Sequence, residues 1–135
     1  ARIIAEGDPY PAELRATAEA VAAAAGLSAD DWQIGWQSAG RTPEPWLEPD
    51  ILTVIDSIAA EGRVDAIVVA AVGFVADHLE VLYDLDIEAA GHAAARGIGF
   101  DRTRCVNDDE TVMAALAGLV VGAADRPTPS NSDSP

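Results

Sequence analysis

Apolar positions recur at helical spacing in four stretches of the chain and crowd together in three shorter runs between them. The predicted helices are residues 11–25, 49–61, 77–96 and 108–123. The runs between them, 32–37, 66–72 and 98–106, have the length and composition of strands. The resulting order, α-β-α-β-α-β-α, predicts an α/β fold with a doubly wound parallel sheet flanked by helices.

The three predicted strands differ in their pattern of apolar and polar residues. Residues 66–72 are apolar at every position, which predicts a parallel strand buried on both faces. Residues 32–37 alternate and carry aromatic side chains, whereas Asp101, Arg102 and Arg104 interrupt residues 98–106. The central strand is therefore the best defined of the three.

Glycine, proline and acidic residues predict where the elements begin and end. Gly26, Gly62 and Gly97 follow three helices, Asp77 is a candidate N-cap of the third helix and Asn107 of the fourth. Residues 38–49 hold three prolines and are predicted to form a loop. The polar segment 125–135 is predicted to be a disordered tail, which leaves 1–124 as one α/β domain. Since the pattern opens on a helix and the first residue is not Met, we expect the chain to be a piece of a longer protein.

The charge balance excludes several classes of function. The 135 residues carry 23 Asp and Glu against eight cations, all of them Arg, for a net charge of −15. Such a chain would repel a nucleic-acid backbone or an anionic membrane surface. No apolar run approaches the roughly 20 residues that span a bilayer. The chain has a single cysteine, Cys105, which excludes an intrachain disulfide and fits the reducing cytoplasm. We expect this side chain to act as a small, buried apolar residue.

Two loops follow predicted strands at the edge of the sheet where α/β proteins bind ligands. The first, 38–49, holds Trp46 between prolines, so the indole could stack on a planar ligand or could instead cover the core. The second, 73–80, leads into the third helix.

The third helix carries Glu80, Asp84 and Glu88 at a spacing of four. Successive carboxylates are about 6 Å apart and drift by about 40° around an α-helix, so they form one row. A π-type turn would align them further. The row could hold a divalent cation, because hard cations prefer oxygen ligands, or it could be a solvated acidic face. His78, two residues before Glu80, is predicted to support the site rather than to react, and His92 is a weaker candidate.

Three blocks of sequence resemble the ferrochelatase family, in particular the coproporphyrin III branch of Gram-positive bacteria and actinobacteria. They are residues 7–11 (GDPYP), 36–50 (WQSAGRTPEPWLEPD) and 72–86 (VGFVADHLEVLYDLD), and the similarity extends over about residues 2–122. The family inserts Fe(II) into a porphyrin in haem synthesis. It has two similar α/β halves with a cleft between them, and this chain resembles the C-terminal half.

The resemblance implies a role for each candidate residue. Glu80 corresponds to the glutamate of the cleft, as catalytic base and metal ligand, and Asp84 and Glu88 to a path for metal ions on a helix with π character. Trp46 and Ser38 belong to the loop that lines the porphyrin. Fe(II) is then a substrate, coproporphyrin III or protoporphyrin IX its acceptor, and the complete protein a cytoplasmic monomer.

The chain also departs from the family pattern. The family's histidine motif would precede Ala1, the N-terminal half is missing, and Cys105 alone cannot build an iron–sulfur cluster. The resemblance therefore implies that the isolated chain is inactive. A metal- or porphyrin-binding module without catalysis, and a cobalt chelatase of the same fold, remain alternatives.

Overall fold

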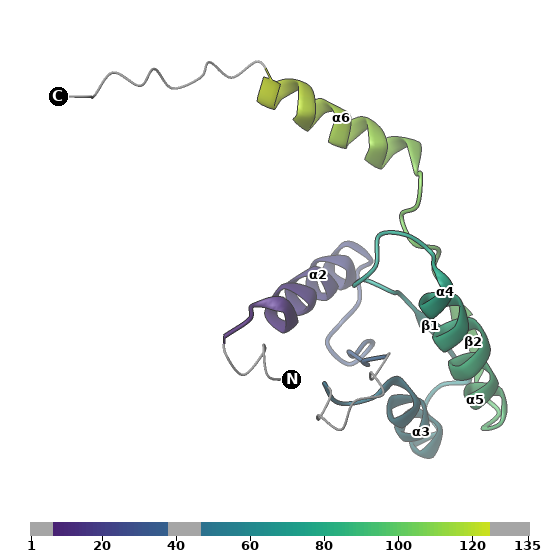
Figure 1. The fold of residues 1–135 in the computed structure, drawn as a ribbon. Coiled ribbons are helices and arrows are strands. Elements are labelled where there is room, and N and C mark those ends of the chain that lie inside the picture. Colours follow the sequence, from purple (N-terminus) through teal and green to yellow (C-terminus); the bar gives the residue numbers. More distant parts are fainter. Residues whose placement is uncertain (1–6, 38–46, 125–135) are drawn as a thin grey trace. The chain divides into compact units, whose positions relative to one another are not determined.

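The computed structural model describes residues 7–37 and 47–124 (Figure 1). The chain divides into two compact units, Ala1–Cys105 and Val106–Pro135.

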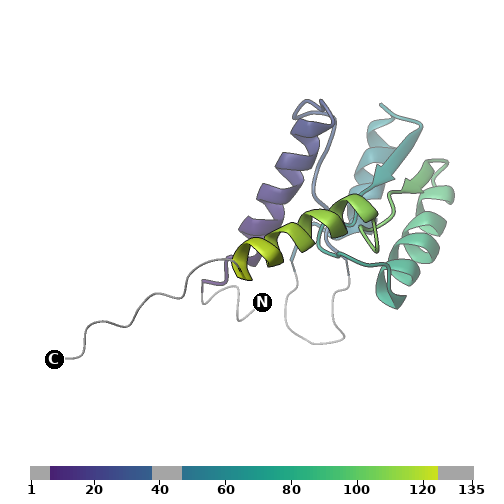
Figure 2. The ribbon, with the colours of Figure 1, turned by 90° about the horizontal axis from the view of Figure 1, so that it is seen from above.

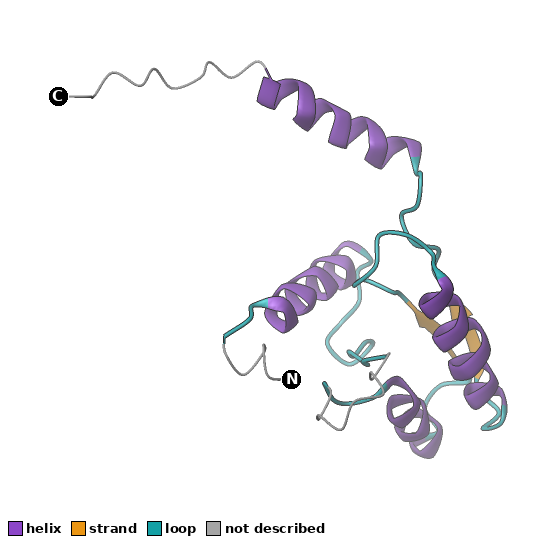
Figure 3. Ribbon diagram, viewed as in Figure 1, coloured by secondary structure: helices purple, strands orange, loops and turns teal. Residues whose placement is uncertain are grey.

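In its described residues, the first unit holds two parallel strands and three helical segments (Figure 3). Strand β1 (Ala66–Val69) pairs in parallel with β2 (Gly99–Arg102), with Ala66 opposite Gly99. One continuous helical segment connects them and consists of α4 (Leu79–Val81), the π-helix η1 (Leu82–Ala89) and α5 (Ala90–Ala94). Helices α2 (Tyr10–Ala24) and α3 (Ile51–Glu61) precede β1. A parallel pair joined through a helix confirms the α/β class.

The predicted helices are confirmed to within two residues at each end. The Asp50 carboxylate accepts a hydrogen bond of 2.8 Å from the Leu52 N–H and so caps α3. Gly62 ends α3 with a φ of 62°, a left-handed conformation that favours glycine. In the second unit, helix α6 covers Glu110–Ala124.

The predicted N-cap of that last helix is corrected. The helix begins at Glu110, and the carboxylate of Asp109 accepts hydrogen bonds from the N–H groups of Thr111 and Val112, at 3.0 and 3.1 Å. Asp109 directly precedes Glu110, so its carboxylate reaches the unpaired N–H groups of the first turn.

The prediction of a strand over 32–37 is wrong. Among the residues that the structure describes, a single parallel bridge forms there, between Trp36 and Asp50. The Trp36 N–H donates to the Pro49 carbonyl at 2.9 Å, and its carbonyl accepts from the Ile51 N–H at 2.7 Å. Since Ile51 is already the first residue of α3, the segment that pairs with Trp36 becomes helical, and the strand pairing cannot extend beyond Asp50.

The other two strands are shorter than predicted. Residues 66–72 pair only as far as Val69, because the N–H of Val72 donates to the Ala70 carbonyl and that of Phe74 to the Ala71 carbonyl, which turns the chain. Residues 98–106 pair only over Gly99–Arg102. The expectation of burial on both faces is also wrong, since Val68 is 70% exposed. Within the first unit, packing against the core is found on the Ile67 and Val69 side.

The core of the first unit lies between the sheet, α3 and the helical segment 79–94 (Figures 1 and 2). Its buried members are Ile55, Val81, Leu85, Ala89, Ala93 and Ile98. Four of them follow each other at a spacing of four. On an α-helix such a row would drift by about 120° over its length. The wider turn of η1 takes up more residues per turn, which keeps the row facing the core.

None of the helices in the two described ranges is long and apolar enough to cross a membrane.

Candidate functional site

A pocket of about 310 Å³ lies at the carboxyl end of β1, where parallel α/β sheets bind ligands. Its walls come from α2, residues 34–37, the start of α3, the turn after β1 and the helical segment that follows this turn. The lining residues are Tyr10, Leu14, Ile34, Gly35, Trp36, Gln37, Ile51, Val69, Ala70, Ala71, Val72, Gly73, Phe74, Glu80 and Leu85. Among these described lining residues, Glu80 is the only carboxylate, in a wall that is otherwise mostly apolar.

Aromatic side chains form one side of the pocket. The rings of Tyr10 and Trp36 lie 6.5 Å apart at 43°. A Cβ atom placed on Gly73 would lie 3.7 Å from the Tyr10 hydroxyl and from the Leu14 side chain, so a larger residue there would extend into this wall. These surfaces suit a flat apolar ligand.

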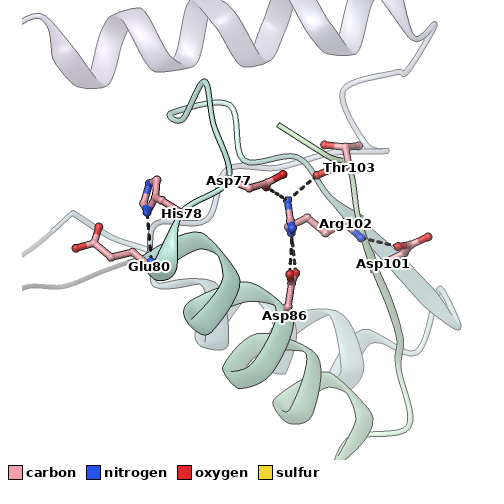
Figure 4. Close-up of polar contacts among 7 residues, drawn as sticks. All are labelled: Asp77, His78, Glu80, Asp86, Asp101, Arg102 and Thr103. Atoms are coloured by element: carbon pink, nitrogen blue, oxygen red, sulfur yellow. Dashed lines mark hydrogen bonds and ion pairs between the residues drawn. The ribbon is translucent and has the colours of Figure 1, made fainter. Parts of the chain in front are cut away.

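His78 begins the helix that carries Glu80. Its Nδ1 accepts a hydrogen bond of 3.2 Å from the Glu80 backbone N–H (Figure 4). Its ring meets that of Phe74 edge-on, with the ring centroids 4.5 Å apart. The predicted N-cap, Asp77, is therefore corrected to His78. Asp77 is instead drawn to Arg102, whose guanidinium lies 2.8 Å away.

Glu80, Asp84 and Glu88 occupy α4 and η1 in a row beside the buried Val81, Leu85 and Ala89. Glu80 and Glu88 are exposed and Asp84 is half-buried. No group of three His, Cys, Asp or Glu residues in the described part of the chain is arranged to hold a metal ion. The carboxylates thus follow one another along the helix rather than meeting at one point, and their metal role stays a prediction.

His92 is next in the same row, but its side chain bonds elsewhere. Its Nε2 lies 2.9 Å from the Asp56 carboxylate of α3, and Arg96 also pairs with Asp56. Burial opposes ionisation of Asp56, yet the hydrogen bonds from Arg96 and His92 outweigh it and lower the pKa of that carboxyl. His92 therefore links α5 to α3.

The sequence analysis missed Arg102, which was seen only as an interruption of the last strand. Its guanidinium binds both oxygens of Asp86, at 2.7 and 3.0 Å, and Asp77 at 2.8 Å (Figure 4). The hydrogen bonds that Arg102 donates hold the pKa of Asp86 below its usual range, and the same bonds raise the pKa of the guanidinium above its usual value. A charged residue in a strand-like run is the one sequence signal that points to such an ion pair, and in 98–106 Arg102 shares this signal with Asp101 and Arg104.

Cys105 lies near the same cluster. Burial raises the pKa of its thiol, and hydrogen bonding with Asp77 raises it further. The thiol is thus held in its neutral form, in keeping with the predicted small apolar residue. Ser38 and Trp46 lie outside the described residues, so their predicted contacts with a substrate stay predictions.

Comparison with known proteins identifies a family. A family model described as "Ferrochelatase" matches residues 1–124. The chain is 46% identical over 120 residues to a coproporphyrin III ferrochelatase of Geobacillus thermodenitrificans, covering 89% of this chain and 37% of that protein. It is 44% identical over 121 residues to a ferrochelatase of Herpetosiphon aurantiacus, covering 90% of this chain and 39% of that protein. A ferrochelatase of Thermus thermophilus is 44% identical over 120 residues. The chain thus spans about two fifths of the length of the curated relatives it matches.

Proposed function

This chain belongs to the ferrochelatase family, and we propose that residues 1–124 are the C-terminal domain of an enzyme that inserts Fe(II) into coproporphyrin III. The similarity to coproporphyrin III ferrochelatases over about nine tenths of the chain supports the substrate. The share of the relatives that it spans, about two fifths, supports the assignment to one domain of two.

The observation that carries the proposal is the position of Glu80. It is the one carboxylate among the described residues of a largely apolar pocket at the carboxyl end of β1. Inserting Fe(II) requires that two pyrrole N–H protons leave the porphyrin while water leaves the metal. The Glu80 carboxylate accepts the pyrrole protons and passes them to water, and by turns it serves as an exchangeable oxygen ligand of the entering ion.

The carboxylates that follow on the same helix supply the metal. Asp84 and Glu88 succeed Glu80 at intervals of four residues along α4 and η1. Their oxygens suit a hydrated divalent cation, because hard cations prefer oxygen ligands. Fe(II) therefore passes from Glu88 to Asp84 and then to Glu80.

The porphyrin lies against the aromatic wall. Tyr10 and Trp36 provide flat surfaces, and Ser38 and Trp46 are further substrate-binding residues of the complete enzyme. The pocket, of about 310 Å³, encloses only part of so large a macrocycle, so the rest of the complete protein supplies the opposite wall. The isolated chain is then inactive, and the complete protein works as a cytoplasmic monomer without an iron–sulfur cluster drawn from this chain.

Glu80→Gln in the complete protein tests the proposal. The amide keeps the shape but accepts no proton, so kcat falls by a factor of about 10² to 10⁴. Absorbance titration with coproporphyrin III follows substrate binding, which stays within about twofold because only proton and metal transfer are lost. The matched control is Glu19→Gln, which removes one charge from the exposed face of α2. Iron insertion at the wild-type rate by Glu80→Gln would refute the role of Glu80.

Binding to the isolated chain separates this function from that of a porphyrin carrier. A domain that supplies only one wall of the porphyrin site should bind coproporphyrin III weakly in a fluorescence titration and should insert no Fe(II) into it. Tight binding of porphyrin by the 135-residue chain alone would favour the non-catalytic carrier.

A further inference from the structure

The Arg102 guanidinium joins three segments of the chain around the helix that carries Glu80. It stands at the end of β2, and its side chain is only 10% exposed. It binds Asp86 of η1 through two parallel hydrogen bonds and Asp77, before α4, through a third. A fourth bond, of 2.9 Å, reaches the carbonyl of Thr103.

One acidic partner precedes the residues proposed to handle the metal, and the other lies among them. Asp77 immediately precedes His78, whose ring caps the Glu80 N–H. Asp86 lies between Asp84 and Glu88 on the π-helix. The Glu80 side chain points away from the Arg102–Asp86 pair (Figure 4). Arg102 thus reaches the start and the middle of the carboxylate row without contacting the Glu80 carboxylate.

The geometry requires arginine rather than a point charge. A planar guanidinium donates to the two oxygens of one carboxylate and still has an N–H for a second carboxylate, whereas an ammonium group lacks this fork. Without Arg102, Asp77 and Asp86 would face each other as two carboxylates without their shared cation. Their repulsion would separate the start of the helix from η1.

We propose that Arg102 is a positioning residue, which holds Glu80 and the carboxylates after it in register with the pocket by fastening Asp77 and Asp86 to the end of β2. This role rests on the proposed function of Glu80. Misplacing a reacting group by about 1 Å can cost about a hundredfold in rate, so a loosened helix would affect metal insertion before it affected the aromatic wall.

The test uses the complete protein with Arg102→Met, Arg102→Lys and, as control, Arg63→Met. Arg63 also pairs with a carboxylate, that of Glu61, but it is 67% exposed and lies after α3. For Arg102→Met we expect kcat per folded molecule to fall between about tenfold and a hundredfold and KM for Fe(II) to rise, with KM for the porphyrin within about twofold. Arg102→Lys should lie between Arg102→Met and the wild type, and Arg63→Met should match the wild type.

Hydrogen exchange supplies a measurement that does not depend on iron insertion. Amides of residues 79–89 should exchange faster in Arg102→Met, while those of α2 keep the wild-type rate. Wild-type exchange over 79–89 together with wild-type kcat would overturn the proposal. Faster exchange in α2 and 79–89 alike, with kcat per folded molecule unchanged, would also overturn it, because Arg102 would then only stabilise the fold.

A further variant keeps the proposal testable if Arg102→Met does not fold. Asp86→Asn preserves the pair between Arg102 and Asp77 but removes the bidentate one. We expect faster exchange over 82–89 and a higher KM for Fe(II), and wild-type values of both would overturn the proposal. Failure of the proposed function itself would appear differently, as an active Glu80→Gln enzyme, and would leave the exchange result of the Arg102 variants unaffected.

Discussion

The Nδ1 atom of His78 accepts a hydrogen bond of 3.2 Å from the backbone N–H of Glu80. The same ring meets Phe74 edge-on, and Phe74 packs against the core of the first unit. The first turn of the helix is therefore fixed by a side chain that is itself held by the core. Only a neutral imidazole with an unprotonated Nδ1 can accept this bond.

Replacing His78 separates its capping role from any chemical one. His78→Ala removes the acceptor and should lower the free energy of unfolding by about 1 kcal/mol, whereas Asn restores an N-cap and should recover most of this loss. Urea denaturation of the two variants measures the difference. A supporting role also predicts that His78→Asn keeps most of the iron insertion of the complete protein. Loss of activity in a fully stable His78→Asn variant would instead assign the imidazole a chemical role.

The sequence predicted the parts of this structure that depend on local signals. The helix over 51–61 follows from apolar spacing and from Gly62, and the row of Glu80, Asp84 and Glu88 from spacing alone. The strand over 32–37 failed because alternation does not specify a partner, and Trp36 bonds to residues that turn into α3. Arg102 was missed for the same reason, since its partners Asp77 and Asp86 lie 25 and 16 residues away.

The pair of Asp86 and Arg102 predicts a pH dependence of stability. Hydrogen bonds from Arg102 lower the pKa of Asp86 in the folded state, against the opposing effect of burial. A lowered pKa stabilises the fold above the ordinary carboxyl pKa of about 4, and this stabilisation is lost as the pH falls through the lowered value.

Urea denaturation of wild type and Asp86→Asn between pH 7 and pH 3 measures this effect. The difference in free energy of unfolding should be largest near neutrality and shrink as the solution becomes acidic. In an Arg102→Met background the same substitution should lose this pH dependence. A difference that stays constant with pH in the wild-type background would contradict the ion pair.

The contact between the two strands makes Gly99 difficult to replace. A Cβ atom on Gly99 would lie 2.9 Å from the Cβ of Ala66, its partner in the parallel ladder. Gly99→Ala should therefore destabilise the fold by about 1–3 kcal/mol through overpacking. Ala66→Gly in the same chain should recover part of the loss, because it removes the opposing methyl group.

Gly91 in α5 is the matched control for this prediction. A Cβ there meets no heavy atom within 4 Å, so Gly91→Ala should stabilise the helix by about 0.5–1 kcal/mol. Thermal unfolding of the three variants measures these effects. Equal stability of Gly99→Ala and the wild type would show that the strands can separate without cost.

Neutralising the outer carboxylates tests the proposed path for the metal. The double substitution Asp84→Asn and Glu88→Gln replaces two carboxylates of the row by neutral amides but leaves Glu80 in the pocket. KM for Fe(II) in the complete protein should rise by about tenfold, since each lost charge weakens the attraction of a divalent cation by a few tenths to about 1 kcal/mol. Because Glu80 remains as base, kcat at saturating metal should stay within about threefold. The matched control, Glu13→Gln with Glu19→Gln, removes two charges from exposed positions of α2 and separates local from overall charge. If KM for Fe(II) rose equally in both double variants, the row would act only through the net charge of the protein. An unchanged KM in the Asp84 and Glu88 variant would exclude the path.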